Sequence, residues 1–140
     1  MVKSKDTNNE ETIIYADWMI VKEEIWTSWY GFLNNLADLL IYQQQGKFSG
    51  VTYSLVMKNF ISVYMKIGVT RFKKYVLEDE LETLKQLYDK VLVGGSLEVI
   101  ELNAARIIFE KFFSDSGMDM LDNEKGRSPS LAVNDVFKQY

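Results

Sequence analysis

The chain has 140 residues, of which 47% are hydrophobic and 26% charged, and this balance indicates one folded domain with a packed core. Its net charge of −4 excludes a uniformly basic nucleic-acid-binding protein, although a local basic patch is compatible with it. Cysteine and histidine are both absent, which excludes disulfides and thiolate metal sites and removes the commonest general base.

The first predicted helix covers residues 12–45 and follows a polar stretch, residues 1–11, that we expect to form a flexible N-terminal arm. Apolar residues in this helix recur every three or four positions and form two adjacent stripes. The main stripe consists of Ile14, Trp18, Val21, Ile25, Trp29, Phe32, Leu36 and Leu39, and the second of Trp26, Tyr30, Leu33, Ala37 and Leu40. Together they form a face too wide for one partner helix, so we expect further helices of this chain or of other copies to cover it.

Two shorter helices follow in the pattern. The second predicted helix spans residues 51–67 and ends at Gly68, and the third spans residues 71–93 and ends at Gly94 and Gly95. The residues expected to face inwards are Val56, Phe60, Val63 and Ile67 in the second helix, and Leu77, Leu81, Leu84, Tyr88 and Val91 in the third.

The fourth predicted helix spans residues 97–113, with Ser96 as its N-cap. Its inward residues are expected to be Ile100, Ala104, either Ile107 or Ile108, and Phe112. Residues 119–130 are polar, contain the only proline and read as a linker. Residues 131–140 can form a short amphipathic helix, which either docks on a partner or packs on its own bundle as a fifth helix.

The predicted fold is all-α: a long N-terminal helix packed with three further helices as a bundle, and a short C-terminal helix after a linker. Residues 12–118 would form the bundle and the oligomerisation domain. Charged residues such as Lys22, Glu23 and Glu24 interrupt the apolar stretches, so we expect no membrane span. The charged start of the chain does not have the pattern of a signal peptide, and we expect a cytoplasmic location, in the host cytoplasm if the protein is viral.

The acidic pairs in the sequence do not form the carboxylate dyads that catalysis requires. Neighbouring residues on a helix, such as Glu23 and Glu24, point about 100° apart, so they are not held together. A carboxylate di-metal site in a bundle would need histidine and inward acids, and no glycine-rich nucleotide motif is present. We therefore expect a non-enzymatic protein with no metal and no cofactor.

One segment of the chain is basic and contains no acid. Its cations are Lys66, Arg71, Lys73 and Lys74. They can contact the phosphates of double-stranded DNA, while the interleaved Phe72 or Tyr75 stacks on bases or sugars. The alternative is a solvated start of a helix. In a symmetric oligomer the segment would repeat as a ring of positive charge.

The stretch over residues 101–118, ELNAARIIFEKFFSDSGM, follows a helix that ends in Gly94, Gly95 and Ser96. It resembles the small terminase subunits of tailed phages, particularly the T7-like group, in which a glycine-containing turn precedes a Leu-Asn-x-Ala-Arg-like helix that runs into an aspartate. The layout from Arg127 to Tyr140 is also similar to the tails by which those subunits engage the large, ATP-hydrolysing subunit. This chain departs from many members because no helix-turn-helix precedes its central helices.

The resemblance implies a non-enzymatic DNA-packaging recognition subunit that forms a homo-oligomer, binds viral double-stranded DNA and passes it to the large motor subunit. Its DNA contacts would be Lys66, Arg71, Lys73 and Lys74, and its motor contacts would be Val133, Val136, Phe137 and Tyr140. The alternative is a helical-bundle structural or adaptor protein, such as a viral coat-like or accessory protein. Such a protein would act only through protein contacts and would not bind DNA.

Overall fold

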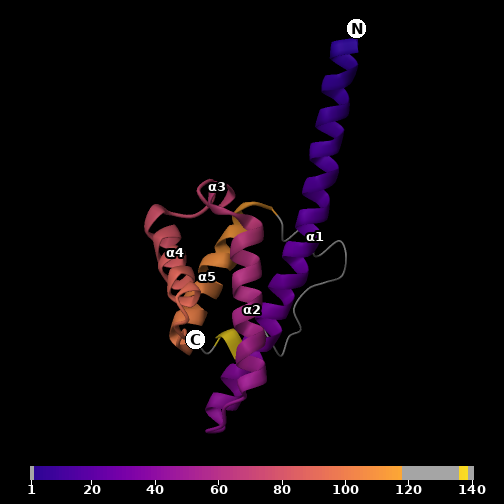
Figure 1. Ribbon diagram of the computed structural model, residues 1–140. Coiled ribbons are helices and arrows are strands. Elements are labelled where there is room, and N and C mark those ends of the chain that lie inside the picture. Colours follow the sequence, from indigo (N-terminus) through magenta and orange to yellow (C-terminus); the bar gives the residue numbers. More distant parts are fainter. Residues whose placement is uncertain (1, 118–135, 139–140) are drawn as a thin grey trace.

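The computed structural model describes the backbone of residues 2–117 and 136–138, and the side chains of residues 22–117 and 136–138. Every regular element in these residues is a helix, so the chain is the all-α helical bundle that its sequence predicts (Figure 1). The helices are α1 (Val2–Gln44), α2 (Gly50–Ile67), α3 (Val69–Phe72), α4 (Glu78–Leu92) and α5 (Val99–Asp115), and residues 136–138 are also helical.

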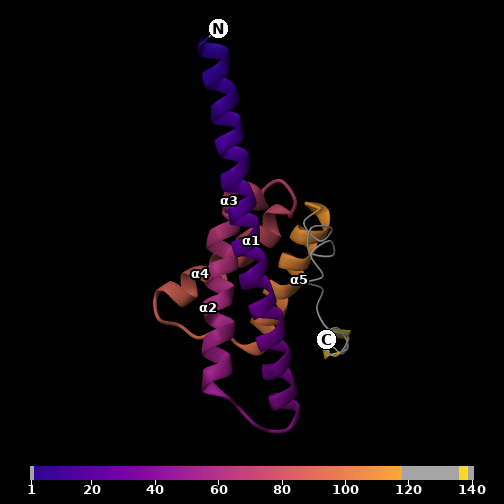
Figure 2. The ribbon, with the colours of Figure 1, turned by 90° about the vertical axis from the view of Figure 1, so that its right-hand side faces the viewer.

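The helices α1 and α2 form an antiparallel hairpin. The contacts that fix its register are Glu24 with Lys66 at 3.7 Å, Ser28 with Ser62 at 2.7 Å, and Gly31 with Asn59. At this register α2 ends level with Glu23, so α1 continues beyond the end of α2 (Figures 1 and 2). The lengths agree with this, because 43 residues of α1 and 18 of α2 correspond to about 64 and 27 Å.

The helix α1 begins at Val2, earlier than the predicted start at Thr12. The prediction of a flexible arm over residues 1–11 took the first apolar residues of the stripe as the boundary. Residues 2–11 contain neither proline nor glycine, so no residue in them breaks a helix that is already nucleated downstream. The start of the helix predicted from polarity alone is therefore wrong, and residues 2–11 belong to α1.

The helix α2 confirms the second predicted helix. Ser49 caps its start, since Ser49 Oγ accepts a hydrogen bond from the Thr52 backbone N–H at 3.2 Å. Gly68 ends it with a φ of +82°, and the Gly68 N–H donates to the Tyr64 carbonyl at 3.1 Å. All the residues predicted to face inwards are buried: Val56, Phe60, Val63 and Ile67.

The single helix predicted over residues 71–93 is wrong, because the chain breaks between α3 and α4. Leu77, predicted to face inwards, is the N-cap of α4 and is 59% exposed. Its backbone N–H donates to Glu80 Oε1 at 2.8 Å, which is half of a capping box. Glu78, Asp79 and Glu80 fill the first turn of α4, where the helix dipole favours negative charge. Local capping therefore starts a new helix inside a continuous apolar pattern.

The helix α5 begins at Val99, later than the predicted start at Leu97. Leu97 is held outside the helix because its N–H donates to the Tyr53 hydroxyl at 2.9 Å and its carbonyl accepts from the same hydroxyl at 2.8 Å. Glu98, rather than the predicted Ser96, is the N-cap. This contact with α2 fixes where α5 starts.

The inward face of α5 differs in part from the prediction. Ile100 is 73% exposed, which contradicts the prediction, and Ala104 is only half-buried. Of the two alternatives, Ile108 is buried and Ile107 is half exposed. The buried residues of α5 are Leu102, Ala105, Arg106, Ile108, Phe109, Phe112 and Phe113.

The core is aromatic and lies where α1, α2, α3 and α5 meet. Phe109 is at its centre, with ring centroids of Trp29, Phe32, Phe60 and Phe72 at 5.7 to 6.0 Å. All five side chains are nearly or fully buried. Each such aromatic pair adds to the free energy gained by burial, so this cluster holds four helices together.

The helix α1 supplies the other side of this core. Its described stripe residues are buried, apart from the half-buried Tyr30, whereas Ile14, Trp18 and Val21 lie outside the described side chains. Trp26 stacks on Phe113 with a centroid distance of 5.1 Å. The buried Trp26 Nε1 has no hydrogen-bond acceptor among the described residues.

Candidate functional site

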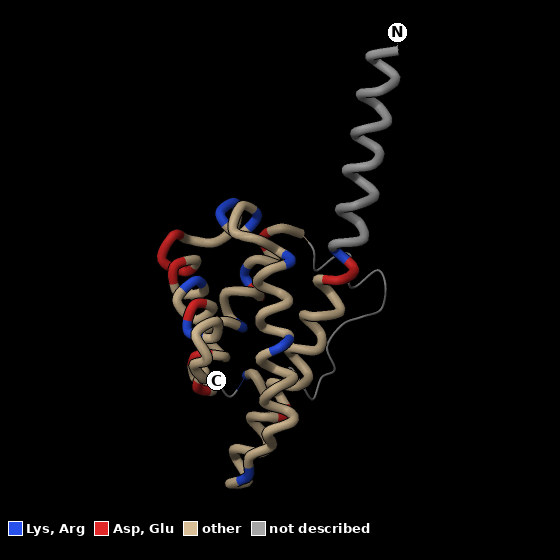
Figure 3. The backbone as a smooth tube through the Cα atoms, viewed as in Figure 1, with Lys and Arg blue, Asp and Glu red and all other residues tan. Residues whose placement is uncertain are grey.

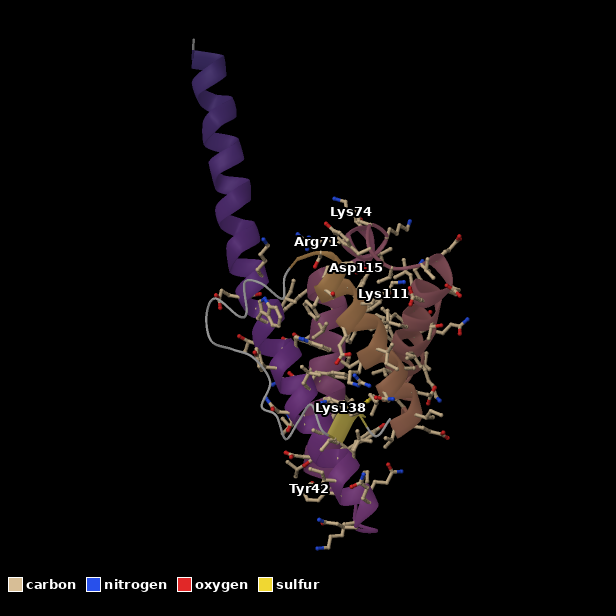
Figure 4. The ribbon with its side chains drawn as sticks, turned by 180° about the vertical axis from the view of Figure 1, so that it is seen from behind. Tyr42, Arg71, Lys74, Lys111, Asp115 and Lys138 are labelled. Atoms are coloured by element: carbon tan, nitrogen blue, oxygen red, sulfur yellow. The ribbon has the colours of Figure 1, made fainter. Side chains whose placement is uncertain are left out.

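The predicted DNA-binding residues lie at the corner where α2, α3 and α4 meet, at the end of the bundle away from the α1–α2 turn (Figure 3). We call Lys66, Arg71, Lys73 and Lys74 the basic corner. Figure 4 shows Arg71 and Lys74 at the same end as Lys111 and Asp115. The backbone therefore brings the four predicted cations into one region, but their side chains have different roles.

Two of the four cations already contact other groups of the bundle. Lys66 Nζ lies 3.7 Å from Glu24 Oε2 and joins α2 to α1. Arg71 Nη1 donates to the carbonyls of Lys66 and Ile67, at 3.1 and 3.0 Å. These carbonyls are at the C-terminal end of α2, where a cation is favoured by the helix dipole. Lys66 and Arg71 would have to give up these contacts to bind a phosphate fully.

The other two cations are open to solvent. Lys73 and Lys74 are exposed, and in the described part of the chain their ammonium groups make no hydrogen bond or ion pair. Phe72, predicted as a possible stacking residue, is fully buried in the aromatic core, which contradicts that role. Tyr75 is 37% exposed and packs edge-on against Phe112 at 5.5 Å. Lys73, Lys74 and Tyr75 are thus the accessible part of the predicted site.

Acidic residues lie directly beside the basic corner. Lys111 Nζ donates to Glu80 Oε1 at 2.9 Å, which joins α5 to the start of α4. This hydrogen bond, with a second one from the Leu77 N–H, lowers the pKa of the Glu80 carboxyl below its usual value. The same contact raises the pKa of the Lys111 ammonium group. The pair stabilises the α4–α5 packing in its charged form.

A surface hollow of about 390 Å³ joins the basic corner to this acidic region. Its lining residues are Lys73, Val76, Glu78, Leu81, Glu82 and Lys85. The lining has two cations and two carboxylates, so its net charge is close to neutral. A groove that tracks a phosphate backbone is predominantly positive, and this hollow is not.

The described residues contain neither a metal-binding cluster nor a membrane-spanning helix. No group of three or more carboxylates lies close enough to hold a metal ion in the part of the chain that the structure describes. Over the same residues, no helix combines the length and the apolar character of a membrane span.

Residues 136–138, the described part of the C-terminal segment (residues 131–140), contact the bundle. Phe137 is only 7% exposed, and Val136 is half-buried against the core. For residues 136–138, the structure therefore matches the alternative in which the tail packs on its own bundle. The other predicted partner contacts, Val133 and Tyr140, lie outside the described residues.

The residue beneath Phe137 was missed by the sequence analysis. Arg106 on α5 is 6% exposed, and its guanidinium carbon lies 4.3 Å from the centroid of the Phe137 ring. Arg106 Nε donates to Asn103 Oδ1 and Nη1 donates to Glu110 Oε1, both at 2.8 Å. The spacing of these residues indicates neighbours on one helix face, but it gives no sign that the arginine is buried.

Large apolar side chains are exposed at the two turns near the other end of the bundle. The turn-end surface, as we call it, consists of Phe48, Val51, Leu92, Val93 and Ile100, each more than 60% exposed. The Tyr53 hydroxyl ties the two turns together through Leu97, and the Phe48 ring lies 5.8 Å from that of Tyr53.

No protein-family model, curated protein or solved structure matches the chain.

Proposed function

We propose that this chain is a non-enzymatic helical protein that works through contacts with other proteins, beginning with copies of itself. The observation that carries the proposal is the turn-end surface, where Val93 alone is 85% exposed. Monomeric proteins rarely leave such groups of large apolar side chains in water, because covering them is favourable. A protein partner would remove them from water.

The length of α1 supports the same proposal. The part of α1 before Lys22 lies beyond the end of α2, and its sequence includes Ile13, Ile14, Trp18 and Ile20. A single helix is only marginally stable in water unless its apolar face is packed. Association with further copies would supply the packing that α2 cannot reach.

The proposal is tested by the mass of the protein in solution over a range of concentrations. The variant carrying Val93→Asp and Ile100→Asp should dissociate at concentrations where the parent is associated, because two charges would be buried at the contact. A matched control carries Met65→Asp and Leu77→Asp, which are similarly exposed but lie near the basic corner. If both variants keep the mass of the parent, the turn-end surface is not a contact.

A second candidate is a small-terminase-like DNA-packaging subunit, and the exposed pair Lys73 and Lys74 favours it. In a ring of copies, two lysines per copy would add up to a continuous positive surface despite the acidic net charge. The tail residues Val133, Val136, Phe137 and Tyr140 would then contact the large motor subunit. Phe137 would have to leave the bundle to do so, since it is buried there.

Binding of short duplex DNA at several salt concentrations tests this candidate. Replacing Lys73 and Lys74 together by alanine should weaken DNA binding. It should also make the affinity less dependent on salt concentration, by the equivalent of about two phosphate contacts per copy. The control replaces Lys47 and Lys58, which are exposed on and after the α1–α2 turn. Equal loss in both variants would indicate general attraction without a defined site, and absence of binding by the parent leaves only the protein-contact function.

A further inference from the structure

The C-terminal segment and the bundle meet at a buried contact between an arginine and a phenylalanine. Arg106 and Phe137 are 6% and 7% exposed, and the guanidinium carbon lies 4.3 Å from the ring centroid. A cation is attracted to the face of an aromatic ring out to about 6 Å. Each side chain therefore shields the other from water.

The arginine is positioned by α5 alone. Asn103 lies one turn before it and Glu110 one turn after it, and each accepts a hydrogen bond from the guanidinium at 2.8 Å. These hydrogen bonds satisfy two different nitrogen atoms and fix the plane of the group. Its orientation does not depend on the C-terminal segment, so the surface that receives Phe137 is already formed.

The contact favours an aromatic side chain over an aliphatic one of similar size. A guanidinium that is almost fully buried loses hydration, and a neighbouring alkyl group does not compensate for this loss. The negative face of an aromatic ring compensates electrostatically. The carboxylate of Glu110 is itself partly exposed, with 45% of its side chain in contact with solvent. The Phe137 ring lies over the guanidinium and is the aromatic neighbour that can compensate for its lost hydration.

The helical turn at residues 136–138 is separate from α5, which ends at Asp115. Residues 118–135 lie between the end of the described α5 region at Gly117 and the helical turn at Val136. The contacts described for this turn are made by the side chains of Val136 and Phe137. The same segment from a second copy carries the same side chains and can make the same contacts.

We propose that the surface of α5 around Arg106, the Arg106 site, is a docking site for an aromatic side chain on a short helical segment. Its resident ligand is the C-terminal segment of the same chain, and the partner that it fits is the C-terminal segment of a second copy. Exchange of these segments would link copies by a second contact. This site is separate from the turn-end surface, so either can fail in an experiment while the other stands.

The test uses a fluorescent peptide with the sequence of residues 131–140 and the full-length chain. The Phe137→Ala variant has a vacated Arg106 site and should bind the peptide. The parent should bind it about 10- to 100-fold more weakly, because a tethered ligand competes at an effective concentration in the millimolar range. Anisotropy titration measures both affinities.

Three further titrations define the chemistry of the site. The Phe137→Leu variant keeps an apolar contact and should bind the peptide with an affinity between those of the parent and the Phe137→Ala variant. A peptide with alanine at the position of Phe137 should lose binding. Replacing Arg106 by methionine in the Phe137→Ala variant, with helical content checked by circular dichroism, should reduce peptide affinity at least tenfold.

Two results would overturn the proposal. Equal binding to the parent and to the Phe137→Ala variant would place the peptide on another surface. No binding to the Phe137→Ala variant at millimolar peptide would mean that the contact forms only when the segment is tethered. The Phe137→Leu variant keeps the second result decisive if the alanine variant fails to fold.

Discussion

Gly31 allows the Asn59 side chain of α2 to lie close against the backbone of α1. A Cβ at this position would lie 2.6 Å from Asn59 Nδ2, well inside ordinary contact distance. Glycine inside a helix costs about 1 kcal/mol relative to alanine, so the pattern alone gives no reason for it. The packing of Asn59 against the backbone of α1 supplies that reason.

Replacing Gly31 by alanine should destabilise the bundle by about 1 kcal/mol, because overpacking costs more than the gain in helix propensity. In a variant that already carries Asn59→Ala, the same replacement should instead stabilise by about 0.5 to 1 kcal/mol. Urea unfolding of the four proteins measures the change of sign. The same effect of Gly31→Ala in both backgrounds would show that Asn59 is not the obstacle.

Single residues also limit what the sequence could reveal about the candidate site. The four cations were recognisable from charge alone, but charge does not show that two of them already contact other groups of the fold. Lys66 pairs with Glu24, which lies on a different helix. Arg71 reaches the carbonyls at the end of α2 because the chain turns at Gly68. Phe72 stands between Arg71 and Lys73 in the sequence and is nevertheless buried, because the direction of α3 decides which side chains face the core.

At the scale of helices, the sequence predicted the second helix well, and it predicted the presence of the fourth helix and the buried stripes of the first over residues 25–40. Their apolar spacing is dictated by burial, and burial is what a periodic pattern records. The break before α4 was not predictable from that pattern, because Leu77 continues the spacing while Glu80 caps a new helix. The start of α5 was shifted by the Tyr53 hydroxyl, which is a tertiary contact.

The acidic start of α4 gives its packing a pH dependence. The pKa of the folded Glu80 carboxyl is lowered, first by the hydrogen bond from Lys111. A carboxyl whose folded pKa is depressed contributes stability above its unfolded value, near 4.5, and this contribution is lost as the pH falls through the folded value. The pKa of the Glu101 carboxyl is lowered as well, mainly by the hydrogen bond from the Glu98 N–H.

The Glu80→Gln variant should therefore unfold a few degrees below the parent at pH 7, and this difference should shrink as the pH falls below about 4.5. Thermal unfolding at pH 7, 5 and 3 measures it. Glu82→Gln, on an exposed position of the same helix, is the control and should follow the parent. A difference that stays constant with pH would assign the effect of Glu80 to packing instead of ionisation.

At the scale of the whole molecule, α1, α2, α3 and α5 share one aromatic core within the described side chains. Phe109 contacts rings from each of the other three helices. The bundle therefore has no separable half, and we expect it to unfold as one cooperative unit. The short α3 joins this unit through Phe72, although it has only four residues.

Replacing Phe109 by alanine should cost about 3 to 5 kcal/mol, since it leaves a cavity where four helices meet. That is a large share of the roughly 5 to 15 kcal/mol by which domains are stable. Phe48→Ala, at a position that is 72% exposed, should stay within about 0.5 kcal/mol of the parent. Urea unfolding followed by circular dichroism compares the three proteins, and equal losses for both variants would refute a single core at Phe109.

All three tryptophans of the chain belong to α1, so the intrinsic tryptophan fluorescence of the protein arises from this helix. Trp26 and Trp29 both lie against Phe113 of α5, at 5.1 and 4.8 Å between ring centroids. Intrinsic emission therefore reports the contact between the first and last helices of the bundle without an added label. Any event that loosens this contact should shift the emission to longer wavelength, while changes confined to α4 should leave the spectrum unaltered.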